Sequence, residues 1–539
     1  MAATFVSYNI ASRAMEASQA SINIVGNNIS NINTEGYTRQ RVDVVSVTNS
    51  GMVQKYANPQ ISSGLGVKAT GTTQLRDPYI DARYRNQNSE NSRYETMVKG
   101  LTNLEDVFDE ASAQALMGEF SSFVLDLNSL AQTPGTSDIA QVVRSAAEKI
   151  TQMMNMYANQ LDEIRTEQTE NLEVTVDSEF NTFVKNIAAL NEQIQREEIY
   201  GNTPNELYDH RNLLIDKLSG IANIKVSMTP ADVISENLSI PHYRITMENP
   251  GGGEPITIVD NGKYAEMSLD AKTDPLNVKL SVVDTTGNLR DDANDLISDG
   301  KLHGYLSIIN GKGTFASATE NNAKGIYYYN EKINIMANKF AEEFNKINSD
   351  IFVEDTTDPI NGYKQNDFAT NPLNLFTDDS GTSTANLTAR NIQVSTEWLK
   401  NPSYINTTKK PFIEGLPATT DYKATPSEPD NVLRMIERMS DQIDFKDSMG
   451  STILSGTFNE YMTSVVSEVG TDVELYTNFS KTATNVFQTI SDSRDSVSGV
   501  SLNEEGINLS AFQKVYNAAM RYFNVLDENL DNVINKMGV

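Results

Sequence analysis

The most regular hydrophobic pattern in the chain lies at its C-terminal end. Apolar positions there follow one another at alternating steps of three and four residues without interruption. This spacing places them on one face of a helix and is typical of a coiled-coil seam. The C-terminal seam comprises Leu509, Phe512, Tyr516, Ala519, Phe523, Leu526, Leu530, Val533 and Met537.

The N-terminal end repeats this spacing, with small residues at two positions where a partner backbone could approach closely. The N-terminal seam comprises Tyr8, Ala11, Met15, Ser18, Ile22, Val25, Ile29 and Ile32. Two seams of one period at opposite ends of the chain predict that residues 1–41 and 500–539 pair as a terminal coiled coil.

Neither seam is expected to order its helix alone. Burying one apolar side chain gains roughly 1.5–3 kcal/mol, whereas ordering each residue's backbone costs about 1–2 kcal/mol. We therefore expect Phe523, at the centre of its seam, to be exposed in the free chain and covered after assembly. A pair of helices would still expose apolar surface, which favours a subunit that packs against further copies or related subunits. The alternative is that the ends simply close an ordinary helical domain.

The part of the chain between the ends alternates between helical and extended patterns. Residues 42–85 lose helical spacing and contain several glycines and prolines, which predicts short strands and turns. Helical spacing from Tyr94 to Leu130 and from Ser137 to Ile194 is interrupted by Thr133-Pro134-Gly135, which predicts a long helix hairpin with Ser137-Asp138 as caps. Between Ile224 and Val283 the period changes to two, which predicts a small β unit.

Helical spacing returns in the second half of the chain. A seam begins near Tyr327 and extends to Ile351, and a long stripe runs from Met462 to Val497, where Asp472 predicts a local break or a shift of face. Residues 350–430 differ in composition, because they hold the single tryptophan, Trp398, and many prolines. We interpret them as an inserted, exposed domain of irregular or β structure.

These patterns predict a mostly α protein with inserted β structure, elongated and multidomain. The expected units are a terminal coiled coil (1–41 and 500–539), a helical body (42–223, 300–349 and 431–499), a small β unit (224–299) and an outer domain (350–430). A length of 539 residues supports three or more such units, since single cores seldom exceed about 250–300 residues.

Composition and charge exclude several classes of protein. The chain has no cysteine, so neither disulfides nor thiolate metal sites are expected. A formal charge of −29 opposes binding to nucleic acid and to anionic membranes. No apolar run is long enough to insert in a membrane, and the first 33 residues carry only Arg13 and Glu16 as charges, which is not the pattern of a cleaved secretory signal.

No pattern of catalytic or metal-binding residues stands out. The three histidines, His210, His242 and His303, do not share a ligand spacing. Asn310–Thr314 lacks the spacing of a phosphate-binding loop, and the acidic pairs at 355–358 and 378–381 lack the ligand positions of a calcium loop. Asn249–Glu254, between two strand patterns, predicts a hairpin loop. We predict no enzyme activity, no cofactor and no metal.

A polar segment follows the N-terminal seam. Residues 27–40, Asn-Asn-Ile-Ser-Asn-Ile-Asn-Thr-Glu-Gly-Tyr-Thr-Arg-Gln, are dense in helix-stopping residues and predict a tight turn near Gly36. The same string resembles the signature that follows the first helix in the axial proteins of the bacterial flagellum, the rod, hook and hook-associated proteins. The residues that carry the signature turn are Asn27, Asn28, Asn31, Asn33, Gly36 and Tyr37.

Three further segments are similar to the hook-associated protein 1 family. Asn205–Ser219 resembles its "LLDQRD-x-L" pattern, with His210 in place of Gln and Asn212 in place of Asp. Phe340–Asn345 resembles its middle helix, and Ser498–Leu509 resembles its linker into the last helix. The resemblance follows the whole chain in order except over 350–430.

The resemblance implies a structural subunit at the hook–filament junction, exported to the exterior through the flagellar type III channel without a cleaved signal peptide. It implies four partners: a ring of its own copies, the hook protein, hook-associated protein 3, and an export chaperone on the C-terminal helix. The assembly interface would consist of Tyr8, Met15, Ile22, Val25, Ile29 and Ile32 with Leu509, Phe512, Tyr516, Phe523, Leu526, Leu530 and Val533.

Two rival interpretations stay open. Within the same class, the chain could be hook-associated protein 3 or a hook protein, although its length and residues 205–219 count against both. From another class, it could be an enzyme or adhesin that uses flagellar-type ends for export and anchoring, with 350–430 as its working domain.

Overall fold

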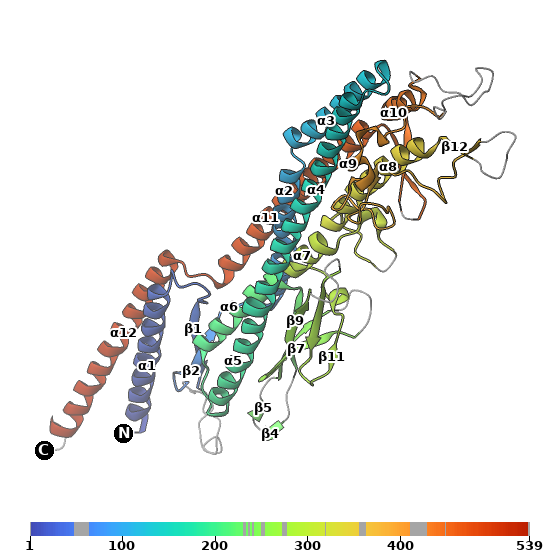
Figure 1. Cartoon of the computed structure of the whole chain (residues 1–539). Helices are drawn as coiled ribbons and strands as arrows, with labels where there is room; N and C mark the ends of the chain where they lie inside the picture. The colour runs from blue at the N-terminus through green and yellow to red at the C-terminus, as the bar shows by residue number, and fades with distance from the viewer. Residues whose placement is uncertain are drawn as a thin grey trace.

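The fold is known from a computed structural model. It describes residues 2–47, 64–229, 233–235, 238–239, 242–248, 254–271, 277–317, 320–354, 363–409, 428–447 and 449–536. The molecule is elongated and mostly helical, and both termini lie at one end (Figure 1). The fold class predicted from the sequence, mostly α with inserted β, is confirmed.

The two ends of the chain form a pair of antiparallel helices, which we call the terminal pair. It consists of α1 (Ala2–Ser30) and α12 (Leu502–Asp531), and a π-helical turn, η5 (Asn532–Lys536), extends α12 (Figure 1). The strands β1 (Gln40–Ser46) and β2 (Val67–Gln74) form an antiparallel hairpin that packs against α1. Met537 lies outside the described residues.

The helical body begins earlier than its apolar spacing predicts. Helix α2 (Pro78–Val107) starts at a proline, and the Asp77 side chain accepts a hydrogen bond from the Tyr79 amide. The prediction of strands and turns up to residue 85 is therefore wrong from Pro78 onward. The helix begins here because a capping carboxylate and a proline in the first turn start a helix without any apolar periodicity.

A long helix hairpin follows. The expected single run from Tyr94 to Leu130 is divided at Asp109, whose carboxylate caps α3 (Glu110–Gln132) by accepting from the Ser112 amide. The turn to α4 (Ser137–Val174) falls at the predicted place, with Gly135 at φ +84°. The expected caps at Ser137-Asp138 are wrong by one residue, because the cap position is Thr136, which makes no side-chain capping bond.

Helix α4 continues through a π-helical turn, η1 (Thr175–Phe180), into α5 (Asn181–Ile199). The continuous run is roughly 95 Å long at 1.5 Å per residue, so the predicted long helical run is confirmed. Helix α6 (Asn205–Ile221) then folds back against α5 and α2. The long helix gives the molecule its extended shape (Figure 1).

The β unit contains two main sheets. One has the order β3 (Ile224–Thr229), β6 (His242–Met247), β7 (Ile256–Asp260), β8 (Lys263–Tyr264), and the other has the order β11 (Leu289–Arg290), β10 (Lys279–Val283), β9 (Glu266–Asp270). The short strands β4 (Val233–Ser235) and β5 (Leu238–Ser239) pair separately. Tyr243, Ile245 and Met247 are buried, as their alternation predicts. Residues 249–253 of the expected hairpin loop lie outside the described residues.

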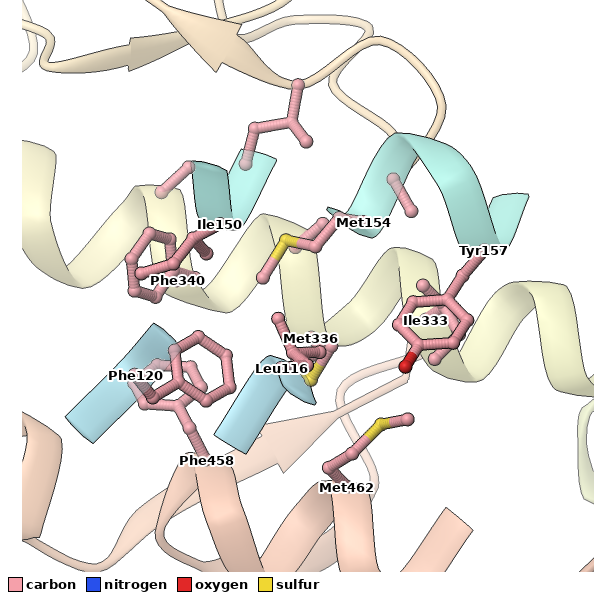
Figure 2. Packing of buried hydrophobic residues seen from close by; sticks show 14 of the residues in the cluster. Leu116, Phe120, Ile150, Met154, Tyr157, Ile333, Met336, Phe340, Phe458 and Met462 are labelled. Atoms are coloured by element: carbon pink, nitrogen blue, oxygen red, sulfur yellow. The ribbon is translucent and has the colours of Figure 1, made fainter. Parts of the chain in front are cut away.

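The core of the body is built from helices distant in sequence. Helices α7 (Gly300–Asn310) and α8 (Ile326–Ser349) follow the sheets, with short 3₁₀ turns at η2 (Asn294–Leu296) and η3 (Gly313–Phe315). Figure 2 shows aromatic, Met and aliphatic side chains of α3, α4, α8 and α11 (Phe458–Ser498) packed together. The labelled residues are Leu116, Phe120, Ile150, Met154, Tyr157, Ile333, Met336, Phe340, Phe458 and Met462.

Helix α11 is continuous, so the predicted break at Asp472 is wrong. The Asp472 carboxylate is buried, accepts a hydrogen bond from the Tyr329 hydroxyl at 2.6 Å and lies 3.2 Å from the Lys324 ammonium. Because the Lys324 ammonium balances its charge and the Tyr329 hydroxyl donates to it, the carboxylate can stay on the packed face of the helix.

The expected outer domain at 350–430 is not separate over its described part. It contains β12 (Phe352–Glu354), β13 (Tyr363–Gln365), β14 (Phe376–Thr377), β15 (Gln393–Val394), α9 (Thr396–Lys400) and η4 (Pro402–Tyr404). Trp398 is fully buried, and its ring lies 5.8 Å from that of Phe376, which packs on Phe340. The segment therefore shares the core of the helical body. The chain returns through α10 (Asp430–Ser440) and the hairpin β16 (Ile443–Lys446) and β17 (Thr452–Gly456).

Candidate functional site

The face of α12 that bears the C-terminal seam lies against α1. Each described seam position from Leu509 to Leu530 is buried or half-buried, while most of the positions between them are exposed. The rings of Phe523 and Tyr8 pack with centroids 4.3 Å apart. The expectation that Phe523 is exposed in the free chain is therefore wrong, because the two seams cover each other within one chain.

The N-terminal seam is buried or half-buried along its described length. Ala11 and Val25 are its most buried apolar members, whereas Ile32 lies beyond the end of α1, in the turn that follows. The small residues Ala11 and Ser18 are both buried. That these seams also contact other subunits stays a prediction.

The signature turn has a defined role at the end of α1. The buried Asn28 side chain accepts hydrogen bonds from the Tyr37 hydroxyl at 2.8 Å and the Gln40 amide at 3.0 Å. Its amide group donates to the Gln40 carbonyl at 2.9 Å and to a Glu505 carboxylate oxygen at 3.1 Å. Burial and nearby carboxylates, Asp209 first, raise the pKa of Tyr37 to about 12, so its hydroxyl stays a donor. All four hydrogen-bonding positions of Asn28 are thereby used.

Glu505 connects the two ends of the chain. It is 1% exposed and accepts hydrogen bonds from Asn28 and from Arg39 Nε, the latter at 2.8 Å. Arg39 also pairs with the exposed Glu504 at 2.8 Å, and its backbone amide donates to the carbonyl of Ser498, the last residue of α11. We call Asn28, Tyr37, Arg39, Gln40 and Glu505 the joint.

Other signature residues shape the turn without contacting α12. Gly36 has φ +80°, and a Cβ there would lie 3.1 Å from the Leu213 Cβ of α6. This close approach and the left-handed backbone explain the glycine. Asn31 donates to the Asn27 carbonyl at 3.0 Å, and Asn33 is exposed.

Residues of the 205–219 segment form hydrogen bonds with the joint and with the end of β2. Gln74 at the end of β2 donates to the buried Asp209 carboxylate at 2.8 Å, and Asn205 donates to the Gln40 side chain at 3.2 Å. His210, which departs from the family pattern, is exposed on α6.

A cluster of five charged residues joins α2, α6 and α11 beside this support. Asp216 lies 2.8 Å from Arg85 Nε and 2.5 Å from an Arg494 terminal nitrogen. Asp81 lies 2.9 Å from Arg76 Nε and 3.0 Å from Arg494 Nε. We call these five residues the charge cluster. Both of its carboxylates contact Arg494 and so hold the C-terminal end of α11, after which α12 begins.

Sequence reasoning missed Arg39, Glu505 and the charge cluster. Polar partners that lie hundreds of residues apart leave no periodic signal. One signal was present for Glu505: it stands four residues before Leu509 and so occupies the register of the seam one turn earlier. A carboxylate in an otherwise apolar register predicts a buried cationic partner.

Replacing Glu505 with Ala is expected to open the joint. The change removes the buried carboxylate that Asn28 and Arg39 share, but Arg39 keeps the exposed Glu504 at 2.8 Å. The cost should therefore be smaller than the about 3–5 kcal/mol of leaving a buried charge with no partner. Hydrogen exchange should become faster along α1 and α12 while the body is unchanged. The matched control is Glu504→Ala, because Glu504 is 61% exposed and such a surface pair contributes about 0–1 kcal/mol. Equal exchange in the two variants would contradict this account of the joint.

Within the described residues, no group of histidine and carboxylate side chains has the arrangement of a metal site. None of the described helices is long and apolar enough to cross a bilayer.

Comparison with known proteins agrees with this description. Residues 101–354 match the family model described as the flagellar hook-associated protein FlgK helical domain, and residues 9–38 match that of the flagella basal body rod protein. The flagellar hook-associated protein 1 of Bacillus subtilis (strain 168) is 27% identical over 547 residues, covering 100% of this chain and 99% of the relative. Its counterpart in Salmonella typhimurium is 24% identical over 591 residues, covering 98% and 99%.

A solved structure shares the fold. The flagellar hook junction protein FlgK from Burkholderia pseudomallei matches with a TM-score of 0.54 and 14% identity, covering 77% of this chain and 100% of that chain. Paired terminal helices and the rod-protein match at the N-terminus define a structural protein of the flagellar axis rather than an enzyme. Within that class, the chain is similar over its whole length to flagellar hook-associated protein 1.

Proposed function

We propose that the chain is a structural subunit of the hook–filament junction that assembles through α1 and α12. Its similarity to hook-associated proteins supports a location in the extracellular part of the bacterial flagellum, among hook components. Adjacent copies in a ring, the hook protein on one side and hook-associated protein 3 on the other are its proposed neighbours.

One observation carries the assembly role: α12 has a second apolar stripe that the chain itself does not cover. Ile507, Val515, Tyr522 and Val525 lie at helical spacing beside the C-terminal seam, and all are exposed, Val525 at 53%. An uncovered apolar face of this length marks an interaction surface. Neighbouring subunits would cover it in the assembly, and an export chaperone would cover it before export.

Export with the N-terminal helix retained is part of this proposal. Tyr8 and Ala11 contribute to the packing against α12. Removing the first turns of α1 as a leader would therefore expose the C-terminal seam.

The rival proposal of an enzyme or adhesin working through 350–430 has less support. Trp398 and Phe376 of this segment serve the core of the body, and its described residues contain no metal-ligand group.

Deleting residues 500–539 tests the proposal. Helix α12 packs on α1 and the joint, whereas both hydrophobic cores lie elsewhere, so the purified variant is expected to keep a folded body by circular dichroism. Cells carrying it should build hooks without filaments, as seen by electron microscopy, and the full-length chain should restore filaments. Normal filaments on the truncated chain would refute assembly through the terminal pair.

A further inference from the structure

A large cavity lies in the body away from the terminal pair. It has a volume of about 870 Å³ and is enclosed by the start of α2, the end of α5, α6 and the strands β3 and β6. Ile194, Ile224 and Val226 supply apolar wall, and Tyr208 and Tyr243 supply aromatic surface. No step of the assembly described above uses this cavity.

Arg211 of α6 lines the cavity and is buried. The side chain is 6% exposed, and its guanidinium stacks 3.9 Å from the centre of the Tyr243 ring. One terminal nitrogen donates to the Asn191 side-chain oxygen at 3.1 Å. The Nε atom is buried and has no hydrogen-bond partner among the described residues. A buried cation without a carboxylate partner is costly, so a cavity beside one favours an anionic ligand.

The other cations that line the cavity are neutralised. Arg76 lies 2.9 Å from Asp81, Arg85 lies 2.8 Å from Asp216, and Lys225 lies 2.8 Å from Glu248. Within the part of the chain that the structure describes, Arg211 has no carboxylate within ion-pair distance. Glu198 also lines the cavity, but its carboxylate accepts from the Tyr208 hydroxyl at 2.5 Å.

The residues that line the cavity favour a carboxylate as its ligand. A guanidinium binds a carboxylate through parallel hydrogen bonds, and among the described cations that line the cavity Arg211 is the one without a carboxylate partner. The apolar and aromatic walls fit the hydrocarbon part of such a ligand.

The surface of the chain itself displays carboxylates of this kind. Glu163, Glu167, Glu170 and Glu173 lie along the outward side of α4, are exposed, and form no ion pair among the described residues. The exposed Val174 follows them. The acidic excess of the chain, −29, makes a second copy a chemically matched donor.

We propose that the Arg211 cavity binds a carboxylate side chain of a neighbouring copy of this chain, as a lateral contact within the ring. The inference rests on the proposed function, which supplies neighbouring copies. It adds a contact that lies outside the terminal helices and that fixes how adjacent bodies are spaced.

The chemistry can be tested on the free chain. Binding of 3-phenylpropanoate, measured by saturation-transfer NMR, should be weakened about tenfold or more for the uncharged 3-phenylpropanamide and for Arg211→Met. Arg196→Met is the matched control, since Arg196 is 61% exposed in its side chain and does not line the cavity. If Arg211→Met is misfolded, Met228→Trp enlarges an exposed lining residue of β3 and should block binding equally. Equal binding of acid and amide would overturn the site.

The source of the carboxylate is tested in assembled flagella. A photo-crosslinker, p-benzoylphenylalanine, replaces Met228, which is 61% exposed at the cavity wall. A crosslink to a peptide of a second copy supports the proposal, whereas a crosslink only to a different protein, or none, overturns it. If the crosslink fails while deletion of 500–539 still prevents filament formation, the junction role stands and this inference alone is lost.

Discussion

Replacing Phe523 with Asp is expected to abolish incorporation of the chain at the hook tip while leaving the helical body folded. The ring packs 4.3 Å from that of Tyr8, at the centre of the seam between α1 and α12. A carboxylate there is either buried without a partner, which costs several kcal/mol, or must be protonated. The loss of the aromatic pair adds about 0.5–1.5 kcal/mol. The terminal pair should therefore separate.

The body should not respond to this change. Phe523 belongs to neither hydrophobic core, so the main thermal transition should shift by no more than an ordinary surface change, about 0.5 kcal/mol. Hydrogen exchange should accelerate only along α1 and α12. Asn524→Asp adds the same charge on the exposed side of α12 and should assemble far better. Collapse of the main transition would show that the terminal helices close the core of the chain, as in an ordinary helical domain.

Replacing Asp216 with Ala is expected to produce the largest loss of stability. The carboxylate is shared between Arg85 and Arg494 and so connects α2, α6 and α11. Removing one member of a buried ion pair costs about 3–5 kcal/mol, because the remaining charge stays buried. Arg494 retains Asp81 at 3.0 Å, which favours the lower end of that range. Urea unfolding followed by circular dichroism measures the loss.

The control for Asp216 is Asp295→Ala. Asp295 pairs with Arg290 at 2.6 Å, but its side chain is 58% exposed, so about 0–1 kcal/mol is expected. Similar losses in both variants would show that the charge cluster is ordinary surface.

The stability of the charge cluster should also depend on pH. Although burial opposes the shift, Arg76 and Arg494 hold the pKa of Asp81 below 3.8. Its contribution is thus present above pH 3.8 and should be lost as the pH falls below that value.

The periodic part of the molecule could be predicted from the sequence. The two seams at the ends, the turn at Gly135 in the helix hairpin, and the alternation of Tyr243, Ile245 and Met247 all reappear in the structure. The seams and the alternation depend on repeats of 3.5, 3.6 or 2 residues, and the turn depends on the local Pro134-Gly135 pair. Each of these signals is visible within a short window of sequence. The sequence also identified Asn28 of the joint, since the signature turn contains it.

Only the tertiary structure decided which polar groups meet. Glu505 reaches Asn28 and Arg39, and Arg494 reaches Asp81 and Asp216, across most of the length of the chain. Trp398, expected in an exposed domain, instead fills the core of the body. Buried charges and irregular segments take their places from neighbours that folding brings together, because each is stable only with partners that no local pattern encodes. The sequence by itself therefore determined the helices and the face by which they pair, and the tertiary structure decided what holds that pair to the body.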